Sequence, residues 1–167
     1  FLPFANVFVK IATKLIRDKK GKEQAEGEAA FLDERLIKNP SVAIDQANRA
    51  ATRMADLAMQ SLGIAFEGFV NGDEGAKEKV DELNARAAEM ERAIVAYLIK
   101  ISAADLSYGD EKLISSIHHA VGDILRISEL SDNITKYTRN CKKDGIEFSQ
   151  GVLKSLQEMY EKIVLLY

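Results

Sequence analysis

The sequence predicts an all-α protein: an antiparallel three-helix bundle followed by an additional C-terminal helix. Three long stretches place apolar residues at alternating spacings of three and four, which is the repeat of one helix face. No window shows the period-two alternation of a half-buried strand, and the 167 residues include only 2 prolines. A chain of this length forms one domain by default and buries about two thirds of its unfolded surface, so it needs no disulfide or metal to fold.

Residues 1–17 combine an apolar run with positive charges that follow it. Residues 1–22 carry a net charge of +5, whereas a secretory signal places its positive charges before the apolar stretch. Spanning a membrane takes about 20 apolar residues, so this segment is too short to span alone. Composition leaves two interpretations open: an amphipathic helix packed on the bundle, or the end of a membrane helix with the rest of the chain on the cytoplasmic side. The apolar residues at helical spacing are Phe4, Phe8, Ile11 and Leu15.

Residues 18–39 are predicted to form a linker, because their first part is rich in charged and small residues that bury little. The helical body, residues 40–167, is expected to begin at the Asn-Pro-Ser run of residues 39–41. Proline is tolerated in the first turn of a helix and pushes the preceding residue out of helical geometry. The apolar residues expected to dock the end of the linker on the bundle are Phe31, Leu32, Leu36 and Ile37.

Each of the three long helices predicted after residue 40 has its own apolar stripe. Turn sequences separate them at residues 71–73 (Asn-Gly-Asp) and 107–110 (Ser-Tyr-Gly-Asp), and such short turns make neighbouring helices antiparallel. The three stripes are, in order, Ala47, Ala51, Met54, Ala58, Ala65 and Phe69; Val80, Leu83, Ala87, Met90, Ile94, Leu98 and Ile101; and Leu113, Ile117, Ala120, Ile124, Ile127 and Ile134.

A fourth apolar stripe follows Asp144 and Gly145, and we expect its helix to cover an open side of the bundle. Helices with a heptad-like period can instead form an intermolecular coiled coil, but the short turns favour packing within the chain. The fourth stripe consists of Phe148, Val152, Leu156, Met159, Ile163 and Leu166.

Composition and missing motifs narrow the function classes. The net charge is −3, so the residues after 22 sum to −8, which argues against a surface that follows nucleic-acid phosphates. The sequence contains no glycine-rich phosphate loop, Cys-x-x-Cys, His-Glu-x-x-His or Gly-x-Ser-x-Gly motif, and we therefore expect no enzymatic activity. Its one cysteine, Cys141, cannot form an internal disulfide and fits a reducing compartment.

The third predicted helix carries the densest polar cluster, in which Asp123, Glu129 and Asp132 are candidate metal ligands. Glu129 and Asp132 are three residues apart and therefore lie on one helix face. Carboxylates from facing helices of a bundle can hold transition metals such as iron or zinc, with imidazole as an additional ligand. His118 and His119 are interpreted as surface or packing residues. The alternative for the whole face is a solvated surface with local ion pairs.

Six runs of residues occur in an order typical of one family. They are residues 31–36 (FLDERL), 39–44 (NPSVAI), 54–58 (MADLA), 91–98 (ERAIVAYL), 123–134 (DILRISELSDNI) and 147–149 (EFS). In this order they resemble the cytoplasmic C-terminal domain of bacterial sodium/phosphate cotransporters, a domain that is PhoU-like. The resemblance covers essentially the whole chain and rests on pattern and order more than on one rigid motif.

The resemblance implies a three-helix PhoU repeat, followed by the first helix of a second repeat and attached to a membrane part through residues 1–17. It thereby favours the membrane-helix interpretation of that segment. The third helix of PhoU proteins carries an acid-x-x-x-Asp motif that can bind metal clusters, and the matching positions here are Leu125 and Glu129. The aspartate often found midway along the second helix is matched by Ala88.

The function implied is that of a regulatory domain of a sodium-dependent phosphate symporter, at the cytoplasmic face of the inner (plasma) membrane. Its partner would be the membrane part of the same transporter, and the chain could also form a homo-oligomer. No nucleic-acid partner is expected. The alternative is a soluble, metal-binding PhoU-type adaptor that regulates phosphate uptake and signalling. A third hypothesis, an iron-carboxylate bundle enzyme, needs two Glu-x-x-His pairs that the sequence lacks.

Overall fold

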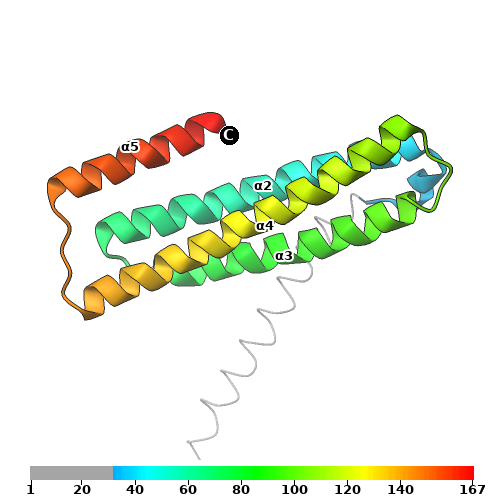
Figure 1. The fold of residues 1–167 in the computed structure, drawn as a ribbon. Coiled ribbons are helices and arrows are strands. Elements are labelled where there is room, and N and C mark those ends of the chain that lie inside the picture. The colour runs from blue at the N-terminus through cyan, green and yellow to red at the C-terminus, as the bar shows by residue number, and fades with distance from the viewer. Residues whose placement is uncertain (1–31) are drawn as a thin grey trace, which may run out of the picture.

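A computed structural model describes residues 32–167, and the predictions for residues 1–17 and for most of the linker lie outside this range. Three long helices form an up-down-up bundle, and a shorter fourth helix lies beside it (Figure 1). Their bounds, after a short 3₁₀ helix η1 (Glu34–Lys38), are α2 (Pro40–Asn71), α3 (Ala76–Ile101), α4 (Tyr108–Lys143) and α5 (Gln150–Leu166). The predicted fold class, a three-helix bundle with an additional C-terminal helix, is confirmed. Within residues 32–167, none of the helices combines the length and the hydrophobicity that crossing a membrane requires.

Local signals in the sequence set the helix ends. Pro40 occupies the first turn of α2, so a helix begins at the Asn-Pro-Ser run as predicted. The same helix ends at Gly72, whose φ of 65° is the left-handed conformation that glycine adopts at little cost. Ser107 caps α4 by accepting a hydrogen bond from the backbone N–H of Asp110, so the predicted turn at 107–110 contributes the first turn of that helix.

The half of the bundle nearest η1 has a continuous apolar core, formed by the first part of α2, the last part of α3 and the first part of α4. The stripes predicted for α2 and α3 are confirmed: their residues are buried, apart from Phe69 and Leu83, which are half-buried. Burial of such side chains is the main favourable term in folding. The largest fully buried side chains of this half are Met54, Ile94, Leu98, Ile101 and Val121.

The other half of the bundle is packed with small and hydroxyl-bearing residues. The predicted stripe of α4 is right at Ile117, which is buried, but wrong at two positions beside the apolar core. Leu113 and Ala120 of that stripe are exposed, whereas Ile114 and Val121 are buried. Further along α4, serines and threonines take the buried positions. The hydroxyls of Ser131, Thr135 and Thr138 bond to carbonyls of their own helix and need no partner across the interface, whereas the hydroxyl of Ser128 has no hydrogen-bond partner. The buried residues of this half are Ala58, Ser61, Ala65 and Gly68 of α2, Ala76 and Val80 of α3, and Ser128, Ser131, Thr135 and Thr138 of α4.

Small residues allow close approach in this half. A Cβ atom on residue 68 would lie only 2.5 Å from the Cβ of Ala76, so the end of α2 can pass the start of α3 at this distance only with glycine there. This contact is local to the turn between the two helices, and it fixes how tightly they are joined.

The segment before α2 is docked on the bundle. Leu32 and Ile37 pack against the apolar core, as predicted for these two residues. The hydroxyl of buried Tyr97 lies 2.9 Å from the carbonyl oxygen of Asp33 and 3.1 Å from Oε1 of Gln46, and Lys100 forms an ion pair with Glu34. Burial, followed by the charges of Asp33 and Glu34, raises the pKa of Tyr97, which therefore stays a hydrogen-bond donor.

Helix α5 runs antiparallel to α2 along the outside of the bundle (Figure 1). The ring of Tyr160 stacks on that of Phe66 with centroids 4.4 Å apart. The ring of Phe148, just before α5, is tilted against that of Phe69 with centroids 5.3 Å apart. The helix lies along the bundle as predicted, but its apolar stripe is not buried by this contact. Aromatic rings make the contact and no residue of α5 is buried, so much of the apolar stripe faces outward. The exposed stripe residues are Phe148, Val152, Met159, Ile163 and Leu166.

We expect Tyr160→Ala to release α5 without unfolding the bundle. A stacked aromatic pair contributes about 0.5–1.5 kcal/mol beyond the area it buries, and α5 adds no buried residue to the core. Amide hydrogen exchange across residues 150–166 should accelerate, while the melting temperature changes little. Tyr137→Ala, which removes an exposed ring on α4, serves as the control. Unchanged protection of α5 in Tyr160→Ala would contradict this docking mode.

Candidate functional site

A groove between α3 and α4 is lined mainly by charged and polar side chains. Its volume is about 680 Å³. It lies over the small-residue half of the bundle, so the side chains on its rim come from two helices held close together. The lining residues are Lys77, Asp81, Asn84 and Ala88 of α3 and Leu125, Ser128, Glu129, Asp132, Asn133 and Lys136 of α4.

Two lysines pair with the carboxylates of this groove. The ammonium of Lys77 contacts Asp81 one turn along α3, and it also reaches across to Oδ1 of Asp132 on α4 at 3.1 Å. Lys136 contacts the other oxygen, Oδ2 of Asp132, at 2.6 Å. The side chains of Lys77 and Asp132 are each only 26% exposed, so water and salt screen their attraction less than at an open surface.

These contacts shift the pKa values of both partners. The hydrogen bond from Lys136, and then the one from Lys77, lower the pKa of Asp132 against the opposing effect of burial. The hydrogen bond to Asp81 comes first in raising the pKa of Lys77. A lowered acid pKa adds stability above the unfolded value of about 4, and a raised lysine pKa adds stability below the unfolded value of about 10.4. The network therefore stabilises the folded chain between these limits and loses its effect as the pH falls through the folded pKa of Asp132 or rises through that of Lys77.

Behind the groove, hydrogen bonds connect all three helices of the bundle. The hydroxyl of Ser61 on α2 donates to Oδ1 of Asn84 on α3 at 2.7 Å. The amide Nδ2 of Asn84 donates in turn to the backbone carbonyl oxygen of Ser128 on α4 at 2.8 Å. Asn84 thus uses one acceptor and one donor to fix the relative positions of α2, α3 and α4 at one level.

The structure brings two of the three predicted metal ligands into the groove. Glu129 and Asp132 line it, whereas Asp123 is exposed and does not. Among residues 32–167, no three His, Cys, Asp or Glu side chains are arranged to hold a metal ion. The two histidines, His118 and His119, are exposed, and their rings lie 6.1 Å apart.

The positions where the chain departs from the PhoU motif lie in the same groove. Ala88 and Leu125 line it and offer no ligand atom. Sequence reasoning missed Lys77, Lys136 and Asn84. Two acid–base pairs at helical spacing, Lys77 with Asp81 and Asp132 with Lys136, could have indicated charged neighbours, but no local pattern indicates that Lys77 reaches α4.

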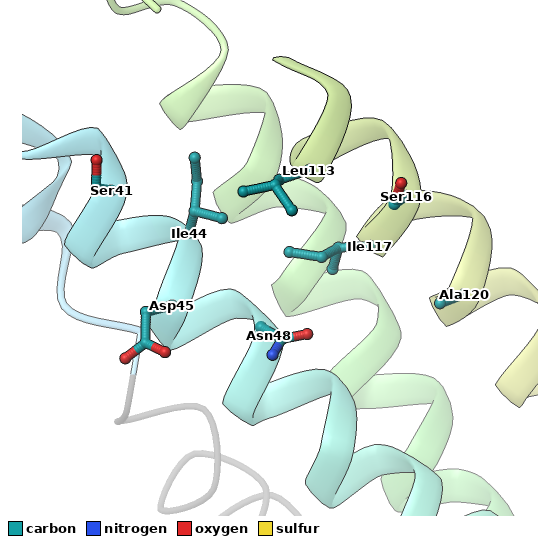
Figure 2. Close-up of a pocket in the computed structure, with 8 residues that line it drawn as sticks. All are labelled: Ser41, Ile44, Asp45, Asn48, Leu113, Ser116, Ile117 and Ala120. Atoms are coloured by element: carbon teal, nitrogen blue, oxygen red, sulfur yellow. The ribbon is translucent and has the colours of Figure 1, made fainter. Parts of the chain in front are cut away.

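A second, apolar groove of about 410 Å³ lies between the first turns of α2 and α4. Figure 2 shows Ile44, Leu113 and Ile117 pointing toward one another across it, while Asp45 points away. Leu113 is 54% exposed, so apolar surface here faces solvent. The groove offers contact area and lacks paired titratable groups, a combination suited to packing rather than chemistry.

Comparison with known proteins supports one family. The PhoU domain family matches residues 51–138, which span α2 from Ala51, all of α3 and α4 as far as Thr138. No curated protein and no solved structure matches the chain. The match covers more than half of the 167 residues and includes all the residues that line the groove between α3 and α4. The chain belongs to the PhoU domain family.

Proposed function

We propose that this chain is the cytoplasmic regulatory domain of a sodium-dependent phosphate transporter, acts in phosphate homeostasis and has no catalytic activity of its own. The observation that carries the proposal is the PhoU match over residues 51–138, since PhoU domains are linked with phosphate regulation. Support for the transporter setting comes from the sequence, in which positive charges follow the apolar run of residues 1–9.

Regulation of this kind needs a physical coupling. A domain can bias a transporter only if it contacts two states of the membrane part with different free energies, typically by about 1–3 kcal/mol. The chain offers two exposed apolar surfaces that suit such contacts: the outward face of α5 and the groove that contains Leu113. The partner proposed is therefore the membrane part of the same protein.

We expect removal of residues 40–167 to alter the control of transport and to leave the transport pathway intact. The measurement is sodium-dependent uptake of labelled phosphate in vesicles, comparing the intact parent protein with a version that ends before Pro40. Both proteins must insert equally, and uptake with sodium replaced by potassium gives the background. A further version that ends after Lys143 removes α5 alone and tests whether its exposed face takes part.

Two results would count against the proposal. Complete loss of uptake by a correctly inserted deletion protein would mean that the domain is needed for transport itself. If the intact parent shows no sodium-driven uptake, the soluble PhoU-type adaptor becomes the better hypothesis. That adaptor would be purified from the cytosol with bound iron or zinc.

A further inference from the structure

The groove between α3 and α4 holds its own positive charges. It is lined by three carboxylates, those of Asp81, Glu129 and Asp132, and by the ammonium groups of Lys77 and Lys136. Both oxygens of Asp132 are engaged, Oδ1 by Lys77 at 3.1 Å and Oδ2 by Lys136 at 2.6 Å. Asp132 therefore has no oxygen that faces the groove without a cation already beside it.

These residues do not fit the metal cluster that the PhoU family implies. A transition-metal site in a bundle needs several carboxylate or imidazole ligands from facing helices. Here Ala88 and Leu125 occupy two of the three positions where the family pattern expects acids, and they contribute no donor atom. A divalent ion bound to Asp132 would also lie next to two ammonium groups, and neighbouring like charges repel strongly in a partly buried site.

We propose that Lys77 and Lys136 form an internal clasp, in which their ammonium groups balance the charges of Asp81 and Asp132 and join α3 to α4 without a divalent cation. Lys77 is the central member, since it contacts one carboxylate on each helix. Lys136 holds Asp132 in position from its own helix, one turn further on. The prediction that Asp123, Glu129 and Asp132 bind metal is the competing hypothesis.

The place of the clasp explains why it is needed. It spans the half of the bundle in which small residues and serine or threonine hydroxyls take the buried positions. Apolar burial contributes less there than in the half that contains Ile94 and Leu98, so polar contacts between helices carry more of the stability. The inference is independent of the transporter proposal, because it concerns the purified chain alone.

The first test measures metal binding by the full chain. Purified protein is equilibrated with Zn²⁺, and separately with Mn²⁺, and bound metal per chain is determined before and after EDTA. The expected result is no stoichiometric metal at the groove and a melting temperature that neither metal nor EDTA changes. Zinc bound one per chain and lost in Asp132→Asn would overturn the proposal. Zinc that Asp132→Asn leaves in place is bound elsewhere and is consistent with the clasp.

The second test removes the central charge. Lys77→Gln should lower the melting temperature by about 2–4 °C, and the difference from the parent should shrink near 1 M salt, where the Debye length falls to about 3 Å. Lys77→Arg keeps the charge and should recover most of the loss. Lys79→Gln, which changes an exposed lysine on the same helix, is the matched control. If Lys77→Gln and Lys79→Gln melt alike, the clasp does not exist.

Discussion

Replacing Ile94 with alanine should destabilise the chain by about 2–5 kcal/mol, the usual range for truncating a fully buried aliphatic side chain. Ile94 lies in the last part of α3 with no exposed surface and belongs to the apolar core. The cost combines lost transfer free energy with the cavity left behind. Native proteins have a total stability of about 5–15 kcal/mol, so the loss is a large share of it.

Urea denaturation followed by circular dichroism measures this effect. The control is Ile99→Ala on the same helix, where the side chain is 66% exposed and truncation should change the free energy of unfolding by less than about 0.5 kcal/mol. Equal losses for the two variants would mean that the core does not lie on the face of α3 that contains Ile94.

Asn84→Leu should cost about 2–3 kcal/mol for a different reason. The substitution leaves the hydroxyl of Ser61 and the carbonyl oxygen of Ser128 without the partners they have in the native chain. An unsatisfied polar group in a buried site costs about 1–3 kcal/mol, more than the net contribution of the hydrogen bond itself. Truncation of exposed Asn133, which lines the same groove, should have little effect.

A double-mutant cycle separates the lost hydrogen bonds from changes in packing. If Asn84 joins the helices through these hydrogen bonds, Ser61→Ala in the Asn84→Leu background should recover part of the loss, because it removes the hydroxyl that has lost its acceptor. Strict additivity of the two substitutions would show that Ser61 and Asn84 do not interact. The cycle therefore tests the contact that joins α2 to α3 at the level of the charged groove.

Together these variants distinguish the two halves of the bundle. The half that contains Ile94 depends on apolar burial, whereas the half that contains Asn84 depends on hydrogen bonds and ion pairs between helices. Polar contacts exchange readily with water, so local opening should begin in the second half. That half also leads into α5, which follows the end of α4 at Lys143.

The sequence by itself determined the helices. Proline at the start of α2, glycine at its end and the serine cap of α4 are local signals, and the stripes of α2 and α3 depend on residues three and four apart. Residues this close along a helix share a face whatever the rest of the chain does. Periodicity therefore predicted the fold class, the helix order and most of the apolar core.

Tertiary structure alone decided which polar residues meet. In α4 the apolar residues suggested a stripe through Leu113 and Ala120, which are exposed. Further along, packing against small neighbours buried Ser131 and Thr138, whose hydroxyls bond to carbonyls of their own helix. The contact between Lys77 and Asp132 joins two helices, so it depends on how those helices pack and on no spacing within either. Helical periodicity is encoded locally, whereas the charge balance of a groove is set by residues that only folding brings together.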